Sequence, residues 1–188
     1  VIHMAAMNPE RGAATAHDDA ALMRSNASAT RAIASRAARD GIGHLIYLST
    51  ALVHAGGPER VTEESPLVPQ NTYASSKLAG EEAVRRTLEG SATPYTILRL
   101  PPVYGPDGRG GLHALIRLAE KPWPLPFGGS PGKRSLLSVH NAADAIAHAL
   151  GSPVARNETF LVTDGQPRSI EEIVRQVRHI RGQPARLL

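Results

Sequence analysis

The chain has 188 residues, 41% of them hydrophobic, and its 21 Lys and Arg residues against 17 Asp and Glu residues give a net charge of +4. The absence of cysteine excludes a disulfide framework and a thiolate metal site, no histidine spacing suggests metal ligands, and no apolar run is long enough to cross a membrane. The arginines are scattered, so we expect a solvated globular chain with no nucleic-acid partner and no membrane contact.

The first predicted element is a short strand, Val1–Ala5, followed by a loop that opens at Met7-Asn8-Pro9. An alanine-rich helix is predicted from Asp18 or Asp19 to about Arg39. Its inward stripe at helical spacing is predicted to contain Leu22, Asn26, Ala29, Ile33 and Ala37. Asn26 is the polar member of this stripe, and a buried amide satisfied by the backbone is one explanation for it.

The next predicted element is a buried parallel strand, Ile42–Ser49, because a short apolar run ends abruptly in Ser49-Thr50. Open α/β sheets bind their ligands outside the carboxyl ends of the strands. The two hydroxyl side chains at the end of this run are therefore candidate site residues.

Residues 71–82 follow, and they lack proline, are rich in small residues and end in acids, which predicts a helix. Helical spacing puts Tyr73 and Lys77 one turn apart on the same face. A free phenol has a pKa of about 10, and an ammonium one turn away favours the phenolate and lowers that pKa. The pair is therefore a candidate acid/base unit.

The remaining elements are a strand, a donor-free Pro101-Pro102 segment and a region rich in loops. After Tyr104, we expect a short helix from about Leu112 to Glu120 and a helix that begins with Asn141 as its N-cap. The other predicted elements are the strands Thr96–Leu100 and Thr159–Thr163 and a capping box, Ser169–Glu172, that opens the last helix.

A strand that ends in Ser49-Thr50 and is followed by Tyr73-x-x-x-Lys77 resembles the extended short-chain dehydrogenase/reductase family, which includes nucleotide-sugar epimerases, reductases and dehydratases. Residues 1–6 and 97–106 resemble the fourth and sixth strands of that family. The resemblance implies an α/β fold, a Rossmann-like doubly wound parallel sheet without its N-terminal strands. Residues 1–104 would carry the catalytic half of the dinucleotide-binding domain, and residues 105–188 would form mainly a small α/β substrate-binding region interleaved with it.

The same resemblance implies a role for particular residues. Tyr73 would exchange the proton of the sugar hydroxyl, Lys77 would lower the Tyr73 pKa and hold the nicotinamide ribose, and Thr50 would bind the reacting oxygen, with Ser49 secondary. Arg134 would bind the substrate diphosphate, a task that suits a guanidinium. The implied cofactor contacts are Ala5, Ala6, Met7, Asn26, Tyr73, Lys77, Pro101 and Val103.

The implied function is an NAD-dependent nucleotide-sugar epimerase that transfers a hydride at C4 of a UDP-type sugar, with NADP not excluded as cofactor. Dehydratases of the family usually carry an Asp-Glu pair after the threonine, where this chain has Ala51 and Leu52, so dehydration is disfavoured. Two alternatives remain open: a nucleotide-sugar 4-reductase and a non-catalytic relative that senses dinucleotide.

No glycine-rich phosphate-binding turn occurs in strand–turn–helix order, because Gly41-x-Gly43 follows a helix and precedes a strand. The resemblance places that turn before the strand at Val1. We therefore expect the chain to be a fragment, inactive by itself, of a longer enzyme that forms a homodimer. Zero cysteine is compatible with a cytoplasmic location.

Overall fold

The computed structural model describes residues 1–8, 18–55, 60–106, 108, 110–129 and 132–188. These residues form two compact units, and the chain passes between them more than once. The first unit contains residues 1–101 and 143–162, and the second contains residues 102–142 and 163–188. The expected boundary after Tyr104 lies close to the change of unit at Pro102, and the return of residues 143–162 makes the two units interleaved in sequence.

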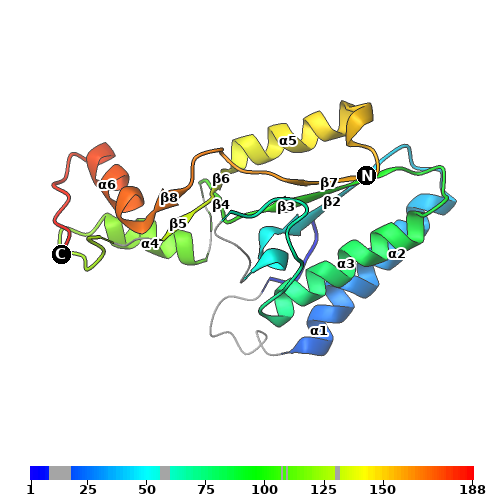
Figure 1. Ribbon diagram of the computed structural model, residues 1–188, viewed down its shortest axis with the longest axis horizontal. Helices are drawn as coiled ribbons and strands as arrows, with labels where there is room; N and C mark the ends of the chain where they lie inside the picture. The colour runs from blue at the N-terminus through cyan, green and yellow to red at the C-terminus, as the bar shows by residue number, and fades with distance from the viewer. Residues whose placement is uncertain (9–17, 56–59, 107, 109, 130–131) are drawn as a thin grey trace. The chain divides into compact units, whose positions relative to one another are not determined.

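The first unit is built on a parallel sheet whose strand order is β1-β2-β3-β7 (Figure 1). Its strands are β1 (Ile2–His3), β2 (Leu45–Thr50), β3 (Tyr95–Leu100) and β7 (Glu158–Leu161). β2 and β3 pair along their whole length, from Leu45 opposite Tyr95 to Thr50 opposite Leu100. Both central strands therefore end together, which places Thr50 at the carboxyl edge of the sheet.

Helices cover both faces of this sheet, as Figure 1 shows. They are α1 (Asp19–Met23), α2 (Ala29–Arg39), α3 (Thr72–Leu88) and α5 (Val139–Gly151). On one face, Tyr47 and Ile97 pack with Val84 of α3. On the other, Ile46 and Leu98 pack with Ala149 of α5. Apolar side chains on both faces are typical of a parallel strand covered by helices, and the expected doubly wound α/β fold is confirmed.

The predicted helix from Asp18 or Asp19 to Arg39 contains a π-helical turn, Arg24–Ser28, between α1 and α2. A π turn closes hydrogen bonds from residue i to i+5, so it holds an extra residue compared with an α turn. As a result the buried residue after Asn26 is Thr30 rather than Ala29, and the next is Ala34 rather than Ile33. The predicted stripe is therefore wrong at Ala29, which is exposed, and at Ile33, which is only partly buried.

Two predicted strands differ from the observed ones at their ends. β1 contains only Ile2 and His3, which pair with Ile46 and Tyr47, and the residues from Met4 to Ala6 continue without pairing. β2 begins at Leu45 rather than Ile42, because the segment before it turns at Gly41, whose φ is +62°. Ser49 and Thr50 therefore lie at the carboxyl end of β2, whereas Ala5 and Ala6 lie beyond the end of β1.

The described residues of the second unit form two small helices, two short strand pairs and the start of α5. α4 (Gly111–Ala119) and α6 (Ile170–Ile180) pack through Ala119 and Val174. The strand pairs are parallel β4 (Val103–Tyr104) with β6 (Leu137–Ser138) and antiparallel β5 (Lys133–Arg134) with β8 (Arg168–Ser169).

Helix caps in this part of the chain agree with the sequence at one position and differ at another. The Ser169–Glu172 capping box of α6 is confirmed, since each side chain bonds the backbone N–H of the other residue. The predicted N-cap at Asn141 is wrong. α5 begins at Val139, the Ser138 hydroxyl accepts from the Asn141 N–H, and the Asn141 amide donates to Asp164.

Gly80 lets α3 lie against the π-helical turn and β2, and replacing it with alanine tests this close approach. A Cβ there would lie 2.2 Å from the Tyr47 hydroxyl and 2.6 Å from the Asn26 carbonyl oxygen. We expect Gly80→Ala to destabilise the fold by about 1–3 kcal/mol, despite the better helix propensity of alanine. Urea unfolding would measure this, with Gly151→Ala as the matched control, because nothing lies within 4 Å of a Cβ at Gly151. Equal stability of the two variants would contradict this account of Gly80.

Candidate functional site

The site residues predicted from β2 lie at its carboxyl end but have different partners. The Thr50 hydroxyl accepts from the Leu52 N–H at 3.2 Å and caps the 3₁₀ turn Ala51–His54. Its neighbour Ser49 donates to the Glu81 carboxylate at 2.6 Å in the interior. Ser49 therefore belongs to a buried network beneath α3, and its secondary catalytic role remains a prediction that no contact of this structure supports.

Tyr73 and Lys77 lie in the first turns of α3. This helix starts at Thr72 after the N-cap Asn71, whose side chain accepts from the Ala74 N–H at 2.8 Å. α3 contacts both β2 and the 3₁₀ turn that follows Thr50. The helix that carries the Tyr-Lys pair thus packs on β2 and on the turn at the carboxyl end of β2. The predicted proximity of the Tyr73 hydroxyl to Thr50 and to the Lys77 amine stays a prediction.

Lys77 is 2% exposed, and its Nζ lies 4.2 Å from the centroid of the Tyr47 ring. An aromatic face attracts a cation, and it does so more strongly when the cation is desolvated. Burial lowers the pKa of Lys77 to about 8, and the negative charge of Glu81 acts in the opposite direction. Lys77 is therefore mostly charged at neutral pH, but close to the point where it loses its proton.

The expected effect of Lys77 on Tyr73 stays a prediction. Burial raises the pKa of Tyr73 above its ordinary value. The Nζ of Lys77 lies over the ring of Tyr47. Burial thus favours the protonated Tyr73 phenol, so Tyr73 must lose its proton before it can act as a base.

Glu81, one turn beyond Lys77, is a buried residue that the sequence analysis did not select. Its carboxylate is fully buried and accepts from Arg99 Nε at 3.0 Å and from Arg99 Nη2 at 2.7 Å. Burial raises the pKa of this carboxyl, but hydrogen bonds from Arg99 and Ser49 outweigh that effect and lower it overall. The charged Arg99 within the mostly buried strand β3 was the signal that could have revealed the pair.

Asn26 is 1% exposed, and all the bonds it makes among the described residues are to the protein. Its carbonyl oxygen accepts from the Met7 N–H at 2.7 Å, while its amide donates to the Met7 carbonyl and to Ser76, each at 2.9 Å. Bonds of this kind are expected if Asn26 is a buried amide satisfied by the protein itself. The side chain holds the segment after β1 against α3, and contact with a cofactor stays a prediction.

The other predicted cofactor and substrate contacts divide between the two units. Ala5 and Ala6 are exposed, directly after β1, and Met7 is partly buried. Pro101 is buried at the end of the first unit, whereas Val103 and Arg134 are exposed residues of the second. The roles of Val103 and Arg134 remain predictions, as does that of Pro101.

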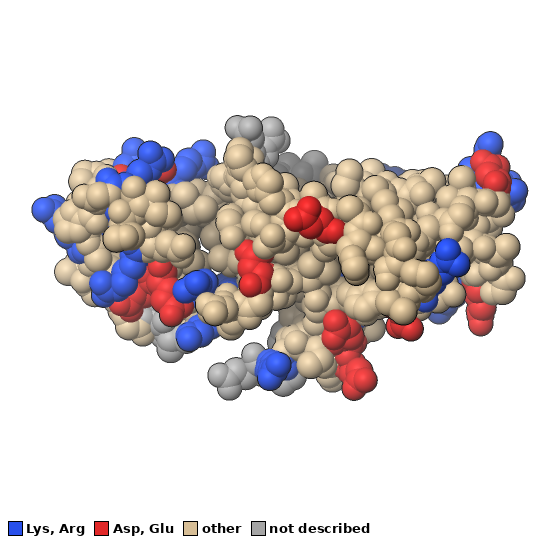
Figure 2. Space-filling view, turned by 90° about the horizontal axis from the view of Figure 1, so that it is seen from above, with Lys and Arg blue, Asp and Glu red and all other residues tan. Residues whose placement is uncertain are grey.

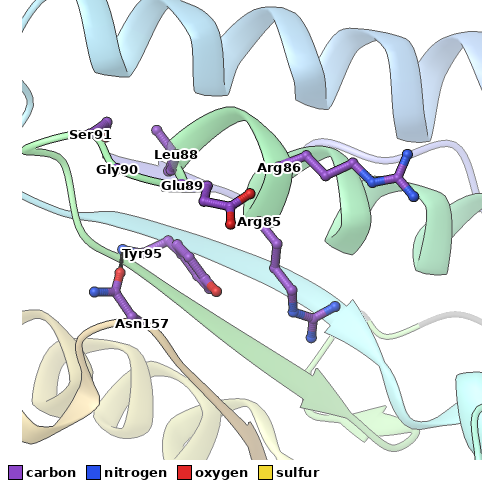
Figure 3. Close-up of a pocket in the computed structure, with 8 residues that line it drawn as sticks. All are labelled: Arg85, Arg86, Leu88, Glu89, Gly90, Ser91, Tyr95 and Asn157. Carbon is purple, nitrogen blue, oxygen red and sulfur yellow. Dashed lines mark hydrogen bonds between the residues drawn. The ribbon is translucent and has the colours of Figure 1, made fainter.

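A shallow hollow lies at the amino end of β3, away from the strand end that follows Arg99 (Figure 3). Arg85, Arg86 and Glu89 of the last turn of α3 line it, together with Tyr95, the first residue of β3, whose N–H donates to Asn157. Tyr73 and Lys77 lie at the start of α3. The hollow is therefore separate from the candidate site and contains none of the predicted site residues.

Within the described part of the chain, no three His, Cys, Asp or Glu side chains gather as metal ligands would, and no helix has the length and apolarity needed to span a membrane. On the face shown in Figure 2, basic and acidic side chains are interspersed.

The parallel sheet covered on both faces, with a Tyr-x-x-x-Lys helix beside the end of a central strand, defines a Rossmann-like protein of the short-chain dehydrogenase/reductase class. The model of the "NAD dependent epimerase/dehydratase family" matches residues 1–162. The chain belongs to this family.

Individual relatives agree with this assignment. The chain is 34% identical over 158 residues to UDP-glucose 4-epimerase of Vibrio cholerae, covering 81% of this chain and 48% of the relative. It is 31% identical over 134 residues to dTDP-L-rhamnose 4-epimerase of Burkholderia thailandensis, covering 68% of this chain and 37% of the relative. The chain thus spans about half or less of the length of these curated relatives.

Solved structures show the same fold. UDP-glucuronic acid 4-epimerase from Bacillus cereus, solved in complex with NAD, superposes with a TM-score of 0.83 at 24% identity, covering 100% of this chain and 61% of that one. The UDP-Glc/GlcNAc 4-epimerase from Campylobacter jejuni has a TM-score of 0.80 at 21% identity, covering 100% of this chain and 63% of that one.

Proposed function

We propose that the protein is an NAD-dependent nucleotide-sugar 4-epimerase and that this chain supplies its acid/base residues. The observation that supports the proposal is that α3, whose first turns carry Tyr73 and Lys77, contacts both β2 and the 3₁₀ turn that follows Thr50. The sequence similarity to UDP-glucose 4-epimerase of Vibrio cholerae, 34% identity over 158 residues, supports the same reaction.

The described residues fit a nicotinamide cofactor at this edge. Nζ of Lys77 makes no hydrogen bond with another described residue, so its N–H groups are available to a ribose hydroxyl. Ala5 and Ala6, exposed after β1, have side chains small enough to let a ligand approach the backbone. When bound, NAD would accept a hydride from the sugar C4 and return it to the opposite face of the resulting ketone.

The chain's own residues would move the proton that accompanies this hydride. Tyr73 would take the proton of the C4 hydroxyl as the hydride leaves, and give it back to the keto oxygen as the hydride returns. Thr50 would donate a hydrogen bond to the same oxygen. Lys77, charged at neutral pH because its pKa is about 8, would favour the phenolate whenever its ammonium faces Tyr73.

The residues after Thr50 support epimerisation over dehydration. A 4,6-dehydratase must also remove a C5 proton and expel a C6 hydroxyl, which requires a further base and acid. Here Ala51 and Leu52 follow Thr50, and neither side chain can transfer a proton.

The cofactor tests the proposal against a 4-reductase of the same family. An epimerase returns its hydride to the same sugar, so the full-length natural protein should keep bound NAD through purification and interconvert UDP-glucose and UDP-galactose without added cofactor. Dependence on stoichiometric NADPH would identify a reductase instead. Binding of dinucleotide without turnover of UDP-glucose, UDP-glucuronic acid or dTDP-linked sugars would favour the non-catalytic alternative.

A further inference from the structure

Glu81 is the most buried ionised group near the candidate site, and it lies on the same helix as Tyr73 and Lys77. Its carboxylate accepts a hydrogen bond from Ser49 at 2.6 Å, two from Arg99 at 2.7 and 3.0 Å, and one from Arg85 at 3.1 Å. Its side chain is 0% exposed, and that of Arg99 is 3% exposed. A buried pair of this kind seldom adds net stability compared with apolar packing, so stability alone does not explain its presence.

The partners of Glu81 lie on both sides of Thr50 in the sequence. Ser49 is the residue immediately before Thr50. Arg99 Nη1 contacts His54 Nε2 at 2.9 Å, and His54 ends the 3₁₀ turn that begins directly after Thr50. Because Arg99 can only donate, His54 Nε2 accepts, which leaves His54 Nδ1 to donate to the Pro66 carbonyl at 3.2 Å. One carboxylate therefore holds α3, β2, β3 and the turn after Thr50 in a single arrangement.

Glu81 also contributes to the electrostatics of Lys77, which lies one turn earlier on the same helix. Two other titratable groups interact with Lys77: His3 of β1, and Tyr47 of β2, whose ring centroid lies 4.2 Å from Nζ. The pKa of His3 is lowered by burial and by the charge of Lys77, and the pKa of Tyr47 is raised by burial. Glu81 is the only anion that acts on Lys77 among the described residues, and Arg99 and Arg85 partly offset its charge.

We propose that Glu81 is a positioning residue for the epimerase reaction: it fixes the strand end on both sides of Thr50 and keeps the neighbouring Lys77 charged. This inference rests on the proposed function, because it assigns Glu81 a role through Thr50 and Lys77 rather than contact with substrate. A purely structural ion pair would stabilise the fold without affecting the protonation of Lys77.

The test is Glu81→Gln in the full-length natural protein, since glutamine keeps the shape but removes the charge. We expect the kcat at pH 7 to fall by about 10-fold or more, with little change in KM for the sugar nucleotide. The basic limb of the kcat profile should move to lower pH by about one unit. The titration of the Lys77 ¹³Cε resonance, identified by its loss in Lys77→Arg, should move in the same direction.

Glu82→Gln is the matched control, because Glu82 is the adjacent carboxylate on α3 but its side chain is 53% exposed and pairs only with Arg86 among the described residues. It should leave both profiles unchanged. Ser49→Ala separates the two parts of the proposal, since it removes the link to the strand end but leaves the charge of Glu81 in place. It should lower kcat without moving the Lys77 titration, and it provides a second test if Glu81→Gln does not fold.

Unchanged kcat in a folded Glu81→Gln protein, or in Ser49→Ala, would overturn the positioning role. A Lys77 titration that does not move in Glu81→Gln would overturn the electrostatic role. The titration is read without substrate, so it still tests Glu81 if the wild-type protein proves inactive on nucleotide sugars, which would count against the proposed function instead.

Discussion

Replacing Tyr73 with phenylalanine is expected to lower the kcat of the full-length protein by about 10²- to 10⁴-fold, the usual contribution of a positioned acid/base group. The substitution removes one oxygen from a partly buried ring and leaves the apolar contacts of the side chain in place. Both half-reactions would then lack a group that takes the C4 hydroxyl proton and returns it. KM should change little, because the phenol oxygen acts mainly in the transition state.

Tyr95→Phe is the matched control for Tyr73→Phe. Tyr95 is also a partly buried tyrosine, but it starts β3 and lines the hollow at the far end of that strand (Figure 3). Its loss of a hydroxyl should leave kcat unchanged. Steady-state assays of the two variants, with retained NAD measured in each, would check this. Activity of Tyr73→Phe close to wild type would remove the acid/base assignment and favour a non-catalytic relative.

Arg178→Met is expected to destabilise the second unit by about 3–5 kcal/mol, because it removes a buried cation on which several backbone groups depend. Arg178 is 1% exposed and donates to the carbonyls of Ala119 at 3.1 Å, Lys121 at 2.9 Å and Trp123 at 2.7 Å. It also donates to the carbonyls of Ala185 and Arg186 near the end of the chain. Methionine fills part of the volume but supplies no donor, so these carbonyls would lose the hydrogen bonds that Arg178 donates.

The measurement is chemical unfolding followed by the fluorescence of Trp123, the one tryptophan of the chain, whose carbonyl Arg178 binds. Arg175→Met on the same helix is the control, since the Arg175 side chain is 54% exposed and its ion pair with Glu171 is worth at most about 1 kcal/mol. If both variants unfold at the same denaturant concentration, Arg178 does not have the structural role described here.

Helices and strands that are marked by a pattern of a few neighbouring residues could be predicted from the sequence. The apolar run before Ser49-Thr50 identified β2, and the spacing of Tyr73 and Lys77 identified the helix that carries them. The side-chain stripe after Asn26 was displaced because a π turn is not visible in apolar periodicity. Asn141 was mistaken for an N-cap because Ser138, three residues earlier, satisfies the same requirement.

The buried network could not be predicted by local pattern. Glu81 and Arg99 are 18 residues apart, and Arg99 and His54 are 45 apart, so their pairing depends on the parallel register of β2 and β3. The same limit applies to the orientation of Lys77. Helical spacing puts its Cα one turn from Tyr73, but the choice between Tyr73 and the Tyr47 ring is made by a strand elsewhere in the sequence.

The central claim is that the edge formed by Thr50, Tyr73 and Lys77 catalyses reversible hydride transfer at C4 of a nucleotide sugar. The most direct test is to incubate the full-length natural protein with UDP-glucose that carries deuterium at C4 and to examine the UDP-galactose formed. An epimerase that keeps the hydride on its own bound NAD should form UDP-galactose with the deuterium retained at C4. Loss of that deuterium to solvent or to added cofactor, or the absence of any C4-inverted product, would contradict the claim.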